Sequence, residues 1–120
     1  MYSAGVLDHF QNPRNAGEIE GADAAAQIEN PVCGDVLRLT LRVGAGRIMA
    51  LRFKAKGCVA SVACASALTE LVTNKTIEEA RSLRCQAIIA AVGGLPQASA
   101  HAAQLAVDTL SAALDQITTA

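Results

Sequence analysis

Two segments of alternating apolar and polar residues constrain the fold of this chain more than any other feature. Apolar side chains recur at every second position from Leu37 to Val43 and again from Met49 to Ala55, mostly with charged residues between them. A period of two is that of a β-strand, and it gives the strand one apolar and one polar face. Because Gly44-Ala45-Gly46 forms a short turn between the segments, we expect a hairpin whose apolar face, Met49 included, lies on the core.

The flanking segments indicate an α+β fold. A weaker strand pattern over Ala25–Asn30 predicts a further strand, and therefore a small antiparallel sheet of about three strands. Helical periods and capping signals predict the helices, which are Ser3–Phe10, the segment from Gly57 to Val72, a short helix opened by Thr76-Ile77-Glu78-Glu79, Gln86–Val92 and about Ser99–Ile117. The last of these has its apolar residues on one stripe, so we expect the helices, including this long C-terminal one, to pack on one face of the sheet.

Size and charge balance limit the classes of function. A chain of 120 residues buries one modest core, so we interpret residues 1–120 as a single domain. The 10 basic residues nearly balance the 11 acidic ones and form no stripe for a phosphate backbone, so we do not expect a nucleic-acid partner. With 2% aromatic residues, the chain also offers little to stack against bases or sugars.

The four cysteines are interpreted from the expected compartment. Met1 to Arg14 contains no long apolar run, so we expect neither a secretory signal nor a membrane span, and we predict a cytoplasmic location. Cysteines of a cytoplasmic protein are reduced by default, and they bind metal, carry sulfur or fill core space. At most two of these four are expected to be functional.

Cys33 and Cys58 occupy positions suited to chemistry. Cys33-Gly34-Asp35 forms a loop before the first clear strand, and Cys58 stands where the second strand gives way to a helix. A thiol at a helix N-terminus faces unpaired N–H groups and the positive end of the helix dipole, which favour the thiolate. Because the two strands run antiparallel, residues 35 and 57 can lie at the same end of the sheet.

His101 is a further candidate. It lies in the first turn of the last predicted helix, opposite the centre of the apolar stripe, so it is not placed as a core histidine. If this helix end reaches the same end of the sheet, two thiolates, a carboxylate and an imidazole converge, a set that suits Zn²⁺ or iron with sulfide. The ordinary interpretations are buried cysteines, a turn residue for Asp35 and a surface residue for His101.

Three other residues favour structural roles. Cys64 projects between Leu68 and Leu71 on the helical wheel, which indicates core packing. Cys85 opens or precedes a short helix and has no partner nearby in sequence, so we interpret it as structural. We expect His9 to be a surface or interface residue.

In order and spacing, these segments resemble the iron–sulfur scaffold family IscU, which is equivalent to the N-terminal domain of NifU. The resemblance covers nearly the whole chain and rests on Leu7-Asp8-His9-Phe10-Gln11-Asn12-Pro13-Arg14-Asn15-Ala16-Gly17, Pro31-Val32-Cys33-Gly34-Asp35, Arg52-Phe53-Lys54-Ala55-Lys56-Gly57-Cys58, Thr69-Glu70 and Leu95-Pro96 leading to His101. It implies a non-enzymatic scaffold that takes sulfide from a cysteine desulfurase, assembles a [2Fe–2S] cluster and passes it to apo iron–sulfur proteins.

The resemblance also implies a role for each candidate residue. Cys33 and Cys58 resemble the family's cluster ligands. Asp35 resembles the aspartate that makes the bound cluster labile enough to transfer, and His101 resembles the histidine beside the third ligand cysteine.

The sequence departs from the family pattern at two places. The third ligand cysteine is replaced by Ala102, which questions de novo assembly more than binding, because that cysteine is also a plausible persulfide acceptor. Cys64 could replace it only by turning from the core stripe toward the site. The segment Leu95-Pro96-Gln97-Ala98-Ser99 stands where scaffolds served by the dedicated chaperone pair carry Leu-Pro-Pro-Val-Lys, which argues against chaperone-driven cluster release.

Three functional hypotheses follow. The first is a scaffold or carrier that binds iron and a labile [2Fe–2S] cluster, or zinc in the apo form, through Cys33, Asp35, Cys58 and His101. The second is a zinc-binding protein that docks on a cysteine desulfurase and modulates it without assembling clusters. The third is a sulfur-transfer component with Cys58 as persulfide acceptor.

Overall fold

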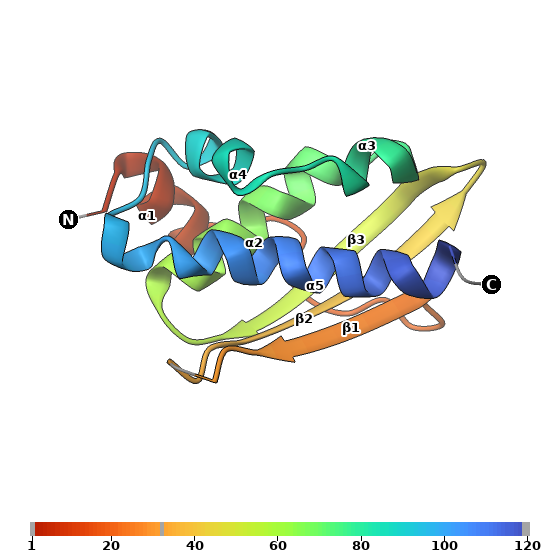
Figure 1. The fold of residues 1–120 in the computed structure, drawn as a ribbon, viewed down its shortest axis with the longest axis horizontal. Helices are drawn as coiled ribbons and strands as arrows, with labels where there is room; N and C mark the ends of the chain where they lie inside the picture. The colour runs from red at the N-terminus through yellow and green to blue at the C-terminus, as the bar shows by residue number, and fades with distance from the viewer. Residues whose placement is uncertain (1, 32, 119–120) are drawn as a thin grey trace.

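The computed structural model describes residues 2–31 and 33–118, and its α+β fold confirms the predicted fold class (Figure 1). The strands β1 (Ala24–Glu29), β2 (Val36–Gly44) and β3 (Arg47–Lys56) form an antiparallel sheet in the order β1-β2-β3. The helices are α1 (Ala4–Gln11), α2 (Val59–Val72), α3 (Ile77–Arg81), α4 (Cys85–Ala91) and α5 (His101–Thr118), with the 3₁₀ turn η1 (Gln97–Ser99) before α5. Each predicted helix and strand is present, with its ends shifted by one or two residues at most.

The helices cover one face of the sheet. Helix α5 lies along β1 and β2, α2 packs on β3 and against α5, and α1 lies against α2 (Figure 1). Helix α2 is enclosed by these neighbours, and most of its buried side chains are small: Ala60, Ser61, Ala63, Cys64, Ala65, Ser66, Ala67, Leu68, Thr69 and Val72. Small side chains let a helix approach its neighbours closely at interior packing density. The two ends of α2 are therefore fixed relative to both the sheet and α5.

The expected burial of Met49 is wrong. Met49 is 53% exposed, whereas Ile48 is fully buried. Strand pairing explains the difference, because Arg42 pairs with Ala50 and Val43 pairs with Ile48, which leaves Met49 as an extra residue at a β-bulge. One inserted residue moves the following side chains to the opposite face, so strict alternation fails at this point.

The segment before β1 pairs with the free edge of β3 at Ala16 and then crosses the outer face of the sheet. The backbone N–H of Gly17 donates to the Phe53 carbonyl over 2.8 Å, and the N–H of Ile19 donates to Oγ1 of Thr40 over 3.0 Å. Thr40 is consequently only 2% exposed although the alternation places it on the polar face. Residues 18–20 thus lie on the side of the sheet away from the helices, whereas Arg14 and Asn15 contact helix α2.

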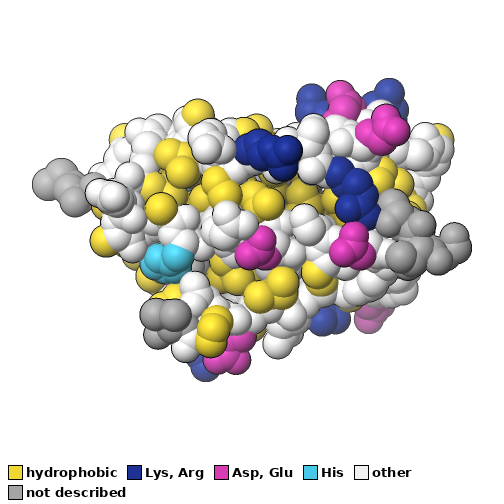
Figure 2. Space-filling view, in the orientation of Figure 1, with side chains coloured by type: hydrophobic (Ala, Val, Ile, Leu, Met, Phe, Trp, Pro, Cys, Tyr) yellow, Lys and Arg dark blue, Asp and Glu magenta, His cyan; other side chains and the backbone are white. Residues whose placement is uncertain are grey.

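The surface seen in Figure 2 is mixed in character, with acidic and basic side chains interspersed among hydrophobic ones. In the described part of the chain, we find no helix that combines the length and the apolar character required to cross a bilayer.

Candidate metal site

The β2–β3 hairpin brings two of the predicted site segments to one end of the sheet. In its register Val36 pairs with Lys56, so Asp35 and Gly57 lie together just beyond the paired residues. Cys58 follows as the N-cap residue of α2. The prediction that residues 35 and 57 share one end of the sheet is confirmed.

Asp35 is the centre of this arrangement and is 4% exposed. Its Oδ2 accepts hydrogen bonds from the Ser61 hydroxyl over 2.5 Å and from the Cys58 thiol over 3.3 Å, and its Oδ1 accepts from the Cys58 backbone N–H over 3.3 Å. Burial by itself raises the pKa of Asp35, but the hydrogen bonds from Ser61, Cys58 and Cys33 outweigh it and hold that pKa below its ordinary value. The carboxylate is therefore ionised at neutral pH.

Gly57 makes room for this carboxylate. Its φ is +150°, and a Cβ at this position would collide with the side chain of Asp35. The neighbouring loop is closed by backbone hydrogen bonds from Gly34 to the Asn30 carbonyl (2.8 Å) and from Asn30 to the Asp35 carbonyl (2.7 Å). Gly34 has a φ of +77°, which glycine adopts without strain. These contacts place Cys33 on an exposed turn beside Asp35.

His101 is the first residue of α5, and this helix end reaches the site, which the sequence left open. Its Nε2 lies 3.6 Å from Oδ2 of Asp35, and its side chain is 35% exposed. The Nε2 atom itself is inaccessible to solvent and has no hydrogen-bond partner among the described residues. An enclosed polar atom without a partner is costly, so this nitrogen is poised for a ligand.

The possible ligand atoms of Cys33, Asp35 and His101 all lie within 4.8 Å of one another. Cys58 is outside this close group, but its sulfur contacts the same carboxylate oxygen that His101 approaches. The structure thus gathers all four predicted donors around Asp35. Sulfur, carboxylate oxygen and imidazole nitrogen form a donor set that fits zinc or iron.

Ser61 is the site residue that the sequence analysis missed. It is the third residue of α2, and its hydroxyl also lies 3.4 Å from the Cys58 sulfur. A hydroxyl three residues after an N-cap lies in the helix's first turn, close to the capping residue, and this spacing was the available signal. We refer to the donors and this serine as the site cluster: Cys33, Asp35, Cys58, Ser61 and His101.

Comparison with known proteins places the chain in a family. The NifU-like N terminal domain matches residues 1–119. The chain belongs to this family. The iron-sulfur cluster assembly scaffold protein IscU 1 of Archaeoglobus fulgidus is 46% identical over 114 residues, which are 95% of this chain and 74% of that protein. The IscU scaffold of Aquifex aeolicus is 41% identical, over 94% of this chain and 73% of that protein.

The fold is that of NifU-like domains as well. The crystal structure of the N-terminal NifU-like protein from Brucella abortus superposes with a TM-score of 0.81, covering 98% of this chain and 94% of that one at 19% identity. This likeness concerns the fold.

The two remaining cysteines of this NifU-like domain lie outside the site cluster. Cys64 is fully buried in the core, as predicted, and burial, with lesser contributions from Cys58 and Cys85, raises the pKa of its thiol to about 12. The thiol of Cys85 donates to Oε1 of Gln104 over 3.2 Å. A thiol as buried as Cys64 stays protonated and is a poor metal ligand.

The expectation that His9 is a surface or interface residue is wrong. His9 is 7% exposed because α1 packs on α2, and its Nδ1 lies 2.8 Å from Oγ of Ser66. Burial, followed by the nearby charge of Arg14, lowers the pKa of His9. Its Nε2 lies 3.6 Å from Glu70. A histidine that sequence alone places on an exposed helix is thus part of the interior.

His9 belongs to a second polar cluster, which ties the N-terminal segment to α2. The backbone N–H of Arg14 donates to Ser66 Oγ over 2.9 Å, and the hydroxyl of Thr69 lies between the Arg14 carbonyl (3.2 Å) and the Asn15 side-chain amide (3.1 Å). We call this group the anchor cluster: His9, Arg14, Asn15, Ser66, Thr69 and Glu70. It accounts structurally for sequence segments that the family resemblance singled out.

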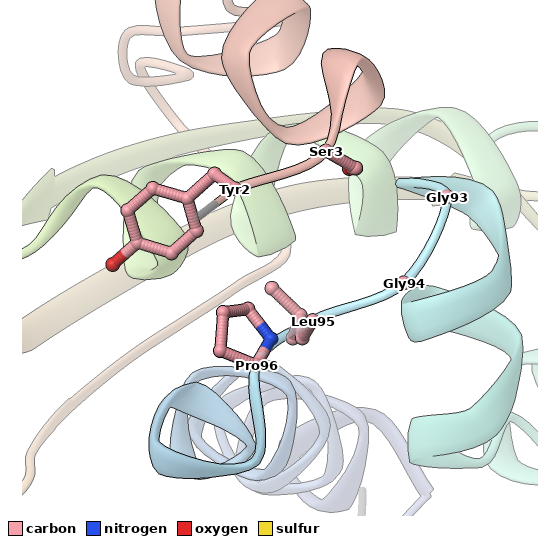
Figure 3. Close-up of a pocket in the computed structure, with 6 residues that line it drawn as sticks. All are labelled: Tyr2, Ser3, Gly93, Gly94, Leu95 and Pro96. Atoms are coloured by element: carbon pink, nitrogen blue, oxygen red, sulfur yellow. The ribbon is translucent and has the colours of Figure 1, made fainter.

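An open hollow lies away from both clusters, between the start of the chain and the loop before α5 (Figure 3). It is lined by Tyr2, Ser3, Gly93, Gly94, Leu95 and Pro96. None of the candidate metal ligands lines this hollow, so it is separate from the metal site.

Proposed function

We propose that this chain is an iron–sulfur cluster scaffold or carrier, with iron and a [2Fe–2S] cluster as its cargo and Cys33, Asp35, Cys58 and His101 as the ligands. The observation that carries the proposal is the enclosed Nε2 of His101, which has no hydrogen-bond partner among the described residues, beside the ionised carboxylate of Asp35, which the sulfur atoms of Cys33 and Cys58 also approach. The scaffold role is non-enzymatic, and it is the role named for the relatives from Archaeoglobus fulgidus and Aquifex aeolicus.

The arrangement suits temporary binding. Cys33 lies on an exposed turn and His101 is partly exposed, so one side of the site is open to an incoming partner. Asp35 supplies a hard oxygen ligand among softer donors, which makes an iron–sulfur cluster easier to release than a set of thiolates would. We infer that a cysteine desulfurase supplies the sulfur and that apo iron–sulfur proteins receive the cluster.

Ala102 bears on whether this chain can assemble a cluster as well as bind one. It follows His101 and is 1% exposed, so a buried methyl group stands at the sequence position where the resemblance implies a third thiol. We propose that this chain holds clusters, and that its capacity to build them is reduced. A cytoplasmic location, a single domain over residues 1–120 and the lack of chaperone-driven release stay predictions.

Anaerobic purification and reconstitution with iron and sulfide tests the proposal. We expect visible cluster absorption and acid-labile sulfide in the unaltered protein, and loss of both in Cys33→Ala and in Cys58→Ala. Cys85→Ala is the matched control, since this thiol contacts Gln104 rather than the site cluster. Absorption that persists in both site variants would contradict the ligand assignment.

Zinc binding is the second candidate, because Cys33, Asp35 and His101 are already within 4.8 Å of one another. Colourless protein with one tightly bound zinc and no cluster after reconstitution would favour a partner or modulator of a desulfurase. The third hypothesis, a persulfide acceptor at Cys58, is tested by mass spectrometry after incubation with a desulfurase and cysteine. A persulfide on Cys58 would support it, and its absence would contradict it. Restoring a thiol by Ala102→Cys should raise cluster yield if assembly is what this chain has lost.

A further inference from the structure

Ser61 connects the two central ligands of the proposed site. Its hydroxyl donates to Oδ2 of Asp35 over 2.5 Å and lies 3.4 Å from the sulfur of Cys58. The side chain is 4% exposed, so water does not compete freely for these contacts. A hydrogen bond to a carboxylate is charge-assisted and stronger than one between neutral groups.

The oxygen that Ser61 holds is the one that faces His101. Oδ2 of Asp35 lies 3.6 Å from Nε2 of that histidine. A carboxylate is free to rotate about its terminal bond unless its oxygens are fixed. The Cys58 backbone N–H holds Oδ1, and the Ser61 hydroxyl and the Cys58 thiol hold Oδ2. Of the two donors to Oδ2, only the hydroxyl is still a donor after Cys58 has bound a metal as a thiolate and released its proton to solvent.

We propose that Ser61 is a positioning residue of the metal site. Its hydroxyl keeps Oδ2 of Asp35 directed toward His101, and it is within reach of the Cys58 sulfur once a metal is bound. The inference rests on the proposed function, since it assumes that these residues bind metal. Outer hydrogen-bond partners orient metal ligands and tune their donor strength, and their loss costs about 10–100-fold in affinity. Because Ala102 contributes no ligand atom, metal affinity depends more strongly on the orientation of Asp35, which Ser61 maintains.

Titration of the metal-free protein with Co²⁺ tests the proposal. Co²⁺ bound by a thiolate produces a thiolate-to-metal absorption band, so one titration gives both the affinity and the spectrum of the site. We expect Ser61→Ala to weaken Co²⁺ binding by about 10–100-fold and to shift this band, and Ser61→Thr, which keeps the hydroxyl, to restore both. Circular dichroism checks that each variant is folded. If Ser61→Ala does not fold, the comparison of Ser61→Thr with the similarly shaped Ser61→Val isolates the hydroxyl.

Ser66→Ala is the matched control. Ser66 is also a fully buried serine of α2, but its hydroxyl bonds His9 and the backbone of Arg14 in the anchor cluster. We expect lower stability with an unchanged Co²⁺ affinity and spectrum. Equal binding and an identical band in Ser61→Ala would overturn the role of Ser61 while leaving the proposed function intact. Failure of the unaltered protein to bind Co²⁺ would overturn both.

Discussion

The site cluster and the anchor cluster each include residues of helix α2, and they differ in the hydrogen bonding of their histidine. In both clusters the histidine Nε2 lies 3.6 Å from a carboxylate oxygen, but the buried His9 also has its Nδ1 hydrogen-bonded to Ser66. In the site cluster, Nε2 of His101 is enclosed without a hydrogen-bond partner among the described residues. The anchor's Arg14 also leaves Nη1 unpartnered, but the same guanidinium bonds an aspartate through Nη2.

The difference gives a criterion for distinguishing a histidine that stabilises the fold from one that is a candidate ligand, namely whether its ring nitrogens already have hydrogen-bond partners. A ring nitrogen that is already hydrogen-bonded gains stability from its partner, and that nitrogen is not free for a ligand. The enclosed Nε2 of His101, near the ionised Asp35, is still available to bind a ligand such as a metal ion. Changes to the anchor cluster should therefore alter the free energy of unfolding, and changes to the site cluster should alter metal binding.

The largest effect is expected for His101→Ala. Under the proposed function His101 is a direct ligand, and its removal should cost more than the roughly 10–100-fold that the loss of an outer hydrogen bond costs, so we expect Co²⁺ or Zn²⁺ affinity to fall by more than about 100-fold. The thermal midpoint should change little, because this ring is partly exposed and its Nε2 bonds no described residue. Competition titration with a chelator measures the affinity. Undiminished binding would break the contrast between the clusters.

His9→Ala should lower the stability of the protein and leave metal affinity unchanged, the opposite of His101→Ala. It removes a buried ring and leaves the Ser66 hydroxyl with one partner fewer, which costs about 2–3 kcal/mol in the free energy of unfolding. Metal affinity should stay unchanged. Urea denaturation of the metal-free protein measures the cost, and a variant as stable as the unaltered protein would show that the anchor is dispensable.

This cost should depend on pH. The pKa of His9 in the folded protein lies below the ordinary value of 6.5, mainly through burial, so the unfolded chain takes up the proton first as pH falls. The stability that His9 contributes is therefore complete above pH 6.5 and is lost as pH falls through the lower folded-state pKa. The difference in unfolding free energy between the unaltered protein and His9→Ala should shrink over this range. A constant difference would contradict it.

Cys64→Ala should have the smallest effect. This residue lies in the core, and removing its sulfur atom leaves a small cavity, for which we expect a cost of about 1 kcal/mol in the free energy of unfolding. Cluster and Co²⁺ binding should be unchanged. Loss of either in a folded variant would mean that Cys64 takes the place of the missing third thiol.

Much of the fold follows from local sequence patterns. The alternation from Leu37 to Val43 predicts β2, and the capping box at Thr76 predicts the start of α3, which the structure confirms with hydrogen bonds in both directions. Met49 is the exception, because a single extra residue at a bulge depends on how two strands pair and leaves no mark on the alternation itself.

The sequence by itself determined the secondary structure, the antiparallel hairpin and the two thiols at its ends, because strand and helix periods, caps and turns depend on residues close together in the chain. Only the tertiary structure decided that His9 is hydrogen-bonded to Ser66 and that Ser61 holds the carboxylate of Asp35. It also decided that the enclosed Nε2 of His101 has no hydrogen-bond partner among the described residues. Hydrogen-bond completion depends on contacts between residues far apart in sequence, and no local pattern records which of two histidines will find a partner.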